Sequence, residues 1–242
     1  MKIIILLKTL LLMVHLILGL FLSIPCYLTR GRIKKNLIVF WSRGILFILN
    51  VKISQNLDLD NLLSNQNYLI TSNHISWLDI LVINSISPLY FVSKDEVKSW
   101  PIINIIAIAA NTIFINRSSK ASIKKINPII KDYLEKKSVC IFPEGTSSDG
   151  RDVLPFKSNL LQSAIDAKCS VLPISIQYFR SQKISTDPAF YADISLIQSL
   201  INTIKAKKIN VKVYVMHPIS GFTNRKNLAH TLYKMTKDSI EL

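Results

Sequence analysis

The chain has 242 residues, 49% of them apolar, and its mean hydropathy of +0.31 is high for a soluble globular protein. Its 30 Lys and Arg against 15 Asp and Glu give a net charge of +15, which favours an anionic membrane surface as a partner, whereas the aromatic content of 9% argues against nucleic acid. The three cysteines (Cys26, Cys140 and Cys169) and the four histidines are widely spaced and show neither a disulfide framework nor a cluster of metal ligands.

Residues 1–52 are predicted to form a membrane-associated helical segment. Residues 3–24 are almost wholly apolar, interrupted by Lys8, Thr9 and His15, and are borderline in length for a helix that crosses a bilayer. The basic run TRGRIKK at 29–35 precedes a second apolar stretch at 36–50, and its positive charges favour the cytoplasmic side for this connection. We expect two apolar helices that either span the membrane or lie along one leaflet.

Residues 53–242 are predicted to form one domain with an α/β fold. Short β-rich runs occur at 67–72, 89–93, 112–116, 138–142, 171–178 and 210–216. Stretches with helical spacing lie between them, among them 118–137 and 158–168. Strands that alternate with helices indicate a mixed, largely parallel sheet flanked by helices. In such sheets, functional side chains gather where strands end.

The motif TSNHISWLDI, residues 71–80, lies at one predicted strand end. The strand ends at about residue 72 and a helix starts at about residue 75, so that His74 falls in the turn between them. Asp79 would lie in the second helical turn and lean back toward His74, accept the Nδ1 proton, and leave Nε2 as a general base. A structural histidine that binds backbone groups at the strand end is the alternative.

Two other strand ends carry polar residues. In FPEGTSSDG at 142–150, Glu144 and Gly145 are followed by hydroxyl residues, and this pattern indicates an anion-binding turn or, alternatively, an ordinary surface loop. Arg117 follows the strand at 112–116 and is either a phosphate ligand or part of an exposed ion pair. The sequence contains no G-x-S-x-G nucleophile elbow, no Walker loop and no G-x-G-x-x-G motif.

Four segments, taken in order, resemble the bacterial 1-acylglycerol-3-phosphate acyltransferase family. They are NHISWLD (73–79), which contains an H-x4-D block, FINR (114–117), FPEGTSS (142–148) and VLPISI (171–176). The resemblance covers about residues 65–180. It implies a membrane-associated O-acyltransferase that moves an acyl group from acyl-ACP or acyl-CoA to the hydroxyl of lysophosphatidic acid, at the cytoplasmic face of the bacterial inner membrane. It implies no cofactor and no metal ion.

The resemblance also assigns roles to individual residues. It implies that His74 is the catalytic base and that Asp79 orients it. The positions that it implies for substrate binding are Lys94, Arg117, Glu144, Gly145, Thr146 and Ser147. Lys94 falls near the acyl carbonyl, whereas Lys157 matches a further basic position that serves either a phosphate or the protein surface.

One departure from the family pattern concerns the acceptor. Ser147 stands where the family commonly has an arginine that helps to hold the acceptor phosphate. Relatives with a hydroxyl residue followed by Asp-Gly include acyltransferases for lyso-ornithine lipid, whose acceptor lacks phosphate. The sequence therefore leaves lysophosphatidic acid and another lyso-lipid as alternatives. A non-catalytic protein that binds a lipid surface is the alternative from another functional class.

Overall fold

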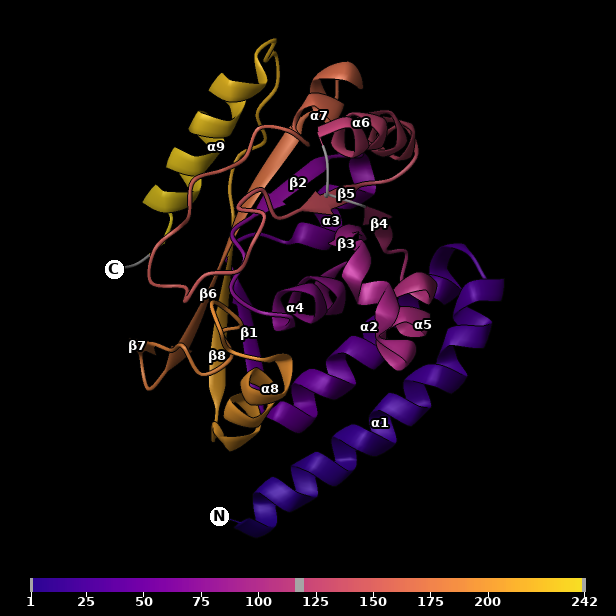
Figure 1. Ribbon diagram of the computed structural model, residues 1–242, viewed down its shortest axis with the longest axis vertical. Helices are drawn as coiled ribbons and strands as arrows, with labels where there is room; N and C mark the ends of the chain where they lie inside the picture. Colours follow the sequence, from indigo (N-terminus) through magenta and orange to yellow (C-terminus); the bar gives the residue numbers. More distant parts are fainter. Residues whose placement is uncertain (1, 116–119, 241–242) are drawn as a thin grey trace.

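The computed structural model describes residues 2–115 and 120–240, and its strands form a single mixed sheet (Figure 1). In spatial order the strands are β1 (Val51–Gln55), β8 (Ile209–Val215), β6 (Val171–Arg180), β2 (Leu69–Ser72), β5 (Val139–Ile141), β3 (Tyr90–Lys94) and β4 (Ile113–Ile115). Strand β6 runs antiparallel to β8 and to the short β7 (Lys183–Ile184), and the other neighbouring pairs are parallel. The predicted fold class is confirmed.

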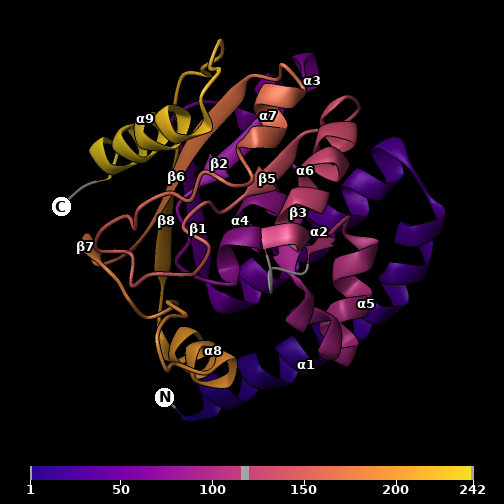
Figure 2. The same ribbon diagram turned by 45° about the horizontal axis from the view of Figure 1, so that its top comes forward.

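Helices cover both faces of the sheet (Figures 1 and 2). One face packs against α6 (Lys120–Leu134), α7 (Gln162–Asp166) and α9 (Arg225–Asp238). The other face packs against α2 (Gly31–Leu49), α3 (Leu59–Asn65), α4 (Leu78–Ile86) and α8 (Leu196–Lys205). The 3-10 helix η1 (Asp95–Ser99) leads from β3 into α5 (Pro101–Ala109), which packs beside α1 (Lys2–Leu28).

The central strands are buried on both faces, which explains their continuous apolar sequences. All four residues of β2 and the first nine residues of β6 are buried. By contrast, β8 alternates between buried residues such as Val211 and Val213 and exposed residues such as Lys212, because only one face of the sheet is covered there. The predicted helix at 158–168 is shorter than expected, since only Gln162–Asp166 is helical.

Helix α1 is attached to the rest of the protein along its length. His15 Nε2 lies 2.9 Å from the carbonyl oxygen of Trp41 on α2, and the Trp41 indole N–H donates to the His15 carbonyl at 3.1 Å. Near the amino end of α1, the Lys8 ammonium donates to three carbonyls at the carboxyl ends of two helices, Leu49 of α2 together with Ile204 and Ala206 of α8. In Figure 1, α1 accordingly lies along the outside of α2 and α5.

Parallel pairing brings the predicted site segments to one edge of the sheet. Thr71 on β2 is in register with Ile141 on β5 and with Pro173 on β6, so the residues that follow β2 and β5 leave the sheet side by side. Strand β3 pairs with β5 and β4 pairs with β3, both in the parallel sense. The carboxyl ends of β2, β5, β3 and β4 therefore lie along the same edge.

Candidate active site

The turn after β2 is held in place by a side chain that forms the hydrogen bonds of a paired strand residue. The Asn73 amide oxygen accepts the backbone N–H of Ile176 on β6 at 2.8 Å, and the Asn73 amide nitrogen donates to the Ile176 carbonyl at 2.9 Å. These two bonds replace one step of the β2–β6 pairing while the main chain turns out of the sheet. Asn73 thereby fixes the position of the backbone from which the turn through His74 begins.

The structure brings His74 and Asp79 together. His74 Nδ1 lies 2.8 Å from Asp79 Oδ2, and the same oxygen accepts the backbone N–H groups of Ile75 at 2.7 Å and Ser76 at 2.9 Å. Because these bonds hold residues 75 and 76 in a turn, α4 begins only at Leu78, and Asp79 lies in its first turn rather than in the predicted second turn. The carboxylate only accepts hydrogen bonds, so the proton of this pair belongs on Nδ1.

The other carboxylate oxygen of Asp79 has a partner that the sequence did not indicate. The Tyr178 hydroxyl, on β6, donates to Asp79 Oδ1 at 2.6 Å, and both side chains are buried. Burial and the neighbouring Asp79 raise the pKa of Tyr178 well above its usual range, so its hydroxyl remains a donor. Asp79 is thus held at both oxygens by four donors.

The free edge of the His74 ring faces outward. The imidazole stacks on the Phe142 ring with a centroid separation of 4.1 Å and an interplanar angle of 17°. Its side chain is 22% exposed, and within the described residues Nε2 has no hydrogen-bond partner. A ring with one nitrogen bound to a carboxylate and the other nitrogen partly exposed is arranged to accept a proton at Nε2.

Glu144 lies behind His74 rather than beside the exposed edge of its ring. The residue is 2% exposed, Oε1 accepts the backbone N–H of His74 at 2.7 Å, and Oε2 accepts the N–H of Leu154 at 3.2 Å. Burial raises the pKa of Glu144 to about 8 despite these two bonds. The carboxyl group therefore ties the His74 turn to the loop that follows β5, and its predicted role in acceptor binding stays a prediction.

The rest of the FPEGTSS segment divides into inward and outward groups. Ser147 donates its hydroxyl to the Phe190 carbonyl, and the backbone N–H of Ser148 donates to the His74 carbonyl at 2.8 Å. Thr146 is exposed. Gly145 has a φ of +73°, and a Cβ placed on it would lie 2.8 Å from Nζ of Lys157. The glycine therefore gives the Lys157 ammonium room beside this turn.

Of the two predicted cationic residues at strand ends, the structure describes one. Lys94 ends β3, on the same edge of the sheet as His74, and is exposed. Arg117 lies outside the described residues. In the part of the chain that the structure describes, no three His, Cys, Asp or Glu side chains gather in a way that could hold a metal ion.

A segment after β7, residues 186–191, packs over the His74 turn and was not indicated by the sequence. The Ser76 hydroxyl donates to the Pro188 carbonyl at 2.6 Å and accepts the N–H of Leu78 at 3.2 Å. The Phe190 N–H donates to the Ile75 carbonyl at 2.9 Å. Ser76 is buried, and its hydroxyl is engaged both as a donor and as an acceptor.

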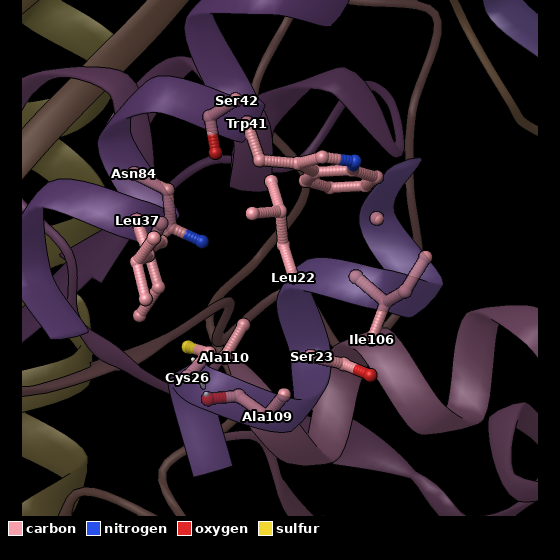
Figure 3. Close-up of a pocket in the computed structure, with 12 residues that line it drawn as sticks. Leu22, Ser23, Cys26, Leu37, Trp41, Ser42, Asn84, Ile106, Ala109 and Ala110 are labelled. Atoms are coloured by element: carbon pink, nitrogen blue, oxygen red, sulfur yellow. Dashed lines mark hydrogen bonds between the residues drawn. The ribbon is translucent and has the colours of Figure 1, made fainter. Parts of the chain in front are cut away.

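A small cavity lies among α1, α2, α4 and α5 (Figure 3). It has a volume of about 40 Å³ and is lined mainly by apolar side chains from α1, α2 and α5, together with Ser23, Ser42 and Asn84. Figure 3 shows the Ser42 oxygen turned toward it, and this buried oxygen has no hydrogen-bond partner in the described residues. This volume suits a few water molecules, not an acyl chain.

Comparison with known proteins agrees with the motif resemblance. A family model described as "Acyltransferase" matches residues 51–177. A 1-acyl-sn-glycerol-3-phosphate acyltransferase of Neisseria gonorrhoeae is 39% identical over 146 residues, which cover 60% of this chain and 57% of that protein. A lyso-ornithine lipid O-acyltransferase of Rhodobacter capsulatus is 34% identical over 171 residues, which cover 66% of this chain and 61% of that protein. The match thus spans about three fifths of each relative.

A solved structure shares the fold. The crystal structure of the 1-acyl-sn-glycerophosphate (LPA) acyltransferase PlsC from Thermotoga maritima superposes with a TM-score of 0.71 at 20% identity, covering 98% of this chain and 93% of that chain. The matched family region contains the His74–Asp79 pair, the FPEGTSS segment and most of β6. On these grounds, this chain belongs to the acyltransferase family.

Proposed function

We propose that this protein is an O-acyltransferase that moves a fatty acyl group from a thioester, acyl-ACP or acyl-CoA, to the free hydroxyl of lysophosphatidic acid, giving phosphatidic acid. The observation that carries the proposal is the arrangement of one imidazole. His74 is bound through Nδ1 to a buried carboxylate, and its Nε2 edge is partly exposed at the carboxyl edge of a largely parallel sheet. Such edges are where α/β sheets place ligands.

The proposed reaction requires no acyl-enzyme. His74 Nε2 takes the proton of the acceptor hydroxyl while that oxygen attacks the thioester carbonyl and forms the new C–O bond. The tetrahedral intermediate then expels the thiolate as the C–S bond breaks, and the imidazolium returns the proton to the sulfur. A positioned general base contributes about 10²- to 10⁴-fold to such a reaction. Asp79 holds the Nδ1–H tautomer and stabilises the imidazolium.

We propose that two exposed cations act on the negative charges of the substrates. We assign Lys94, at the end of β3, to the developing oxyanion of the acyl carbonyl. We assign Lys157, whose ammonium lies beside Gly145, to the acceptor head group together with the exposed Thr146. Arg117, which follows β4 in the sequence, is a further proposed ligand of the head group.

Lyso-ornithine lipid is the second candidate acceptor. Ser147 replaces a family arginine and donates its hydroxyl to the Phe190 carbonyl, so this side chain does not supply a cation. Curated relatives named lyso-ornithine lipid O-acyltransferases are 29% to 34% identical to this chain, whereas those named 1-acyl-sn-glycerol-3-phosphate acyltransferases include the 39% match. Higher identity and the basic residues near the edge favour the phosphate-bearing acceptor.

A direct transfer assay tests the function. The full-length protein, reconstituted in phospholipid nanodiscs, is incubated with radiolabelled acyl-ACP or acyl-CoA and with either lyso-lipid. We expect labelled phosphatidic acid from wild type and from the control His217→Ala, an exposed histidine, and a loss of at least 100-fold in His74→Ala. Label only in ornithine lipid would select the second acceptor. Transfer that survives in His74→Ala, or no transfer to either lyso-lipid, would contradict the proposal.

The proposed location is the cytoplasmic face of the bacterial inner membrane, with α1 lying in one leaflet. Helix α1 is long and apolar enough to cross a membrane, yet Lys8 and the His15–Trp41 contacts bind it to the domain along its length. Its outer face exposes apolar side chains, and α5 beside it also exposes Ile102, Ile105 and Ile108. The exposed Arg30 and Arg32 follow α1 directly, where they suit anionic lipid head groups.

Membrane attachment and orientation are tested separately. Phe21, 67% exposed on α1, is replaced by Asp, and Ile129, 47% exposed on α6, is replaced by Asp as the control. We expect Phe21→Asp alone to weaken binding to phosphatidylglycerol vesicles. An amino-terminal tag should be cleaved by protease in inside-out membrane vesicles and protected in spheroplasts. Cleavage in spheroplasts would instead indicate a spanning helix.

A further inference from the structure

The buried tyrosine at the end of β6 lies directly beneath the His74 turn. Strand β2 ends at Ser72, which is in register with Ile174, but β6 continues to Arg180. Residues 174, 176 and 178 share one face of β6 because side chains alternate along a strand. Tyr178 is therefore placed past the end of β2, where the chain has already left the sheet, and it is 1% exposed.

The contacts of Asp79 divide between its two oxygens. Oδ2 accepts three N–H groups that belong to the turn itself, those of the His74 ring, Ile75 and Ser76. Oδ1 accepts one donor within the described residues, the Tyr178 hydroxyl at 2.6 Å. A carboxylate held at one oxygen still rotates about that point, whereas donors at both oxygens fix its plane and hence the direction of the His74 ring.

Tyr178 itself is fixed by its surroundings. Its carbonyl accepts the N–H of Ser185 at 2.8 Å, which closes the β6–β7 hairpin. Other titratable groups close to Asp79 include His74, the buried thiol of Cys140 and the carboxyl of Glu144. Three of the four donors to Asp79 described above belong to the turn at residues 74–76, whereas the Tyr178 hydroxyl comes from strand β6.

From this geometry we propose that Tyr178 is a positioning residue for the His74–Asp79 pair, acting through Asp79 Oδ1 and not on the substrate. The inference rests on the proposed acyl transfer. It assigns to Tyr178 a part in turnover that a tyrosine buried only for packing would not have. Removing its hydroxyl leaves a buried carboxylate oxygen without a donor. The Asp79 carboxylate then rotates more freely, and its less shielded negative charge stabilises the protonated form of His74 more strongly.

The test is Tyr178→Phe, which keeps the ring and removes the hydroxyl. We expect kcat to fall about 10- to 100-fold, the KM for the lyso-lipid to stay within about twofold, and the acid limb of the kcat/KM profile to move to higher pH. Tyr68→Phe, which alters a buried tyrosine just before β2, is the matched control and should change none of these. Normal kcat and an unmoved acid limb in Tyr178→Phe would overturn the inference.

A second measurement separates an effect through Asp79 from a general loss of packing in Tyr178→Phe. Because Tyr178 is proposed to act through Asp79 Oδ1, removal of its hydroxyl should change kcat less than about twofold when Asp79 has already been replaced by alanine, which removes the acceptor. A further loss of tenfold or more in Tyr178→Phe/Asp79→Ala relative to Asp79→Ala would show that Tyr178 acts elsewhere. If wild type and Tyr68→Phe transfer no acyl group, the proposed function fails instead, so the two failures are distinguishable.

Discussion

Asp79→Asn separates the charge of Asp79 from its hydrogen bonds. In enzymes where a carboxylate orients a catalytic histidine, an amide at that position permits the wrong tautomer and costs about 10⁴-fold in kcat. From the sequence alone, the same outcome is expected here. The structure changes that expectation, because Oδ2 accepts two backbone N–H groups in addition to the His74 ring.

The backbone N–H groups of the His74 turn determine the orientation of the amide side chain in Asp79→Asn. An inverted amide would place its –NH2 group against the backbone N–H groups of Ile75 and Ser76, which lie 2.7 and 2.9 Å from Oδ2 of Asp79 in the wild-type protein, whereas the His74 ring would change tautomer and accept at Nδ1. Each lost backbone bond costs about 1–3 kcal/mol, which amounts to roughly 2–6 kcal/mol against the inverted form. In the upright form the amide oxygen takes the place of Oδ2, and the –NH2 group faces Tyr178, whose hydroxyl rotates to accept. The Nδ1–H tautomer of His74 is therefore kept.

What Asp79→Asn removes is the charge that stabilises the imidazolium. A pair of unit charges about 4 Å apart at an effective dielectric constant of about 20 interacts by about 4 kcal/mol, and the retained neutral hydrogen bond offsets part of this. A net loss of about 2–4 kcal/mol corresponds to a decrease in kcat of roughly 30- to 1,000-fold. The variant should thus be about 30- to 1,000-fold slower than wild type, which is a smaller loss than the roughly 10⁴-fold expected of an inverted amide.

Single-turnover acyl transfer to the lyso-lipid is the assay, with Asp149→Asn, a partly exposed carboxylate after the FPEGTSS segment, as the control. Thermal unfolding of each variant checks that the fold is intact. A rate equal to wild type would mean that the charge on Asp79 has no part in turnover. A loss of roughly 10⁴-fold would mean that the amide is inverted, and the argument from the two backbone donors would be refuted.

Three further substitutions test the packing and the buried acid. Gly44→Ala should lower the thermal midpoint by the equivalent of about 1–3 kcal/mol, because a Cβ there would lie 2.6 Å from His15 Nε2; an unchanged midpoint would argue against the α1–α2 packing. Lys8→Met should also destabilise the protein, since it removes the donor to the carboxyl ends of α2 and α8, and protease should then cleave α1 sooner than in wild type. For Glu144, the pKa of about 8 in the folded protein lies above the ordinary value of 4.5, so the folded state holds the extra proton between these values and stability falls by up to about 1.4 kcal/mol per pH unit as pH rises through this window. Glu144→Gln should remove this slope from the thermal midpoint measured between pH 5 and 8, and an identical slope in both proteins would contradict a protonated Glu144.

Local patterns were sufficient to predict six of the eight strands that the structure describes, together with the His74 turn. The strands β2, β3, β4, β5, β6 and β8 all fall within or beside predicted runs, because their apolar and β-branched residues are continuous where both faces are buried. Strand β1 (Val51–Gln55) was missed, since its sequence VKISQ is short and half polar, as expected of a strand at the edge of a sheet. The helix start at Leu78 was missed for a different reason, which is that Asp79 binds the amides of the two preceding turn residues.

Tyr178 could not be predicted because its contact depends on distance along two different strands. In the sequence it is one of eight tyrosines, at the end of an apolar run with no polar neighbour except Gln177. Its hydroxyl reaches Asp79 only because β6 extends beyond the last residue of β2 and because β2 pairs with β6 in parallel. A sequence signal exists only in hindsight: a tyrosine at an inward-facing position, four residues beyond the one in register with Ser72.

The FPEGTSS segment shows why a motif does not by itself say which side chains meet the substrate. Glu144 and Ser147 are the polar residues that a reader of the sequence would place around a head group, yet both are bound to backbone groups inside the protein. The side chains left facing outward are those of Thr146 and Lys157. In the proposed function, recognition of the acceptor at this turn depends on a positive charge and a hydroxyl, which is the complement expected for an anionic head group. A zwitterionic head group with its own ammonium would meet Lys157 as a like charge, so the location of this one ammonium bears more directly on the choice of acceptor than the identity of residue 147 does.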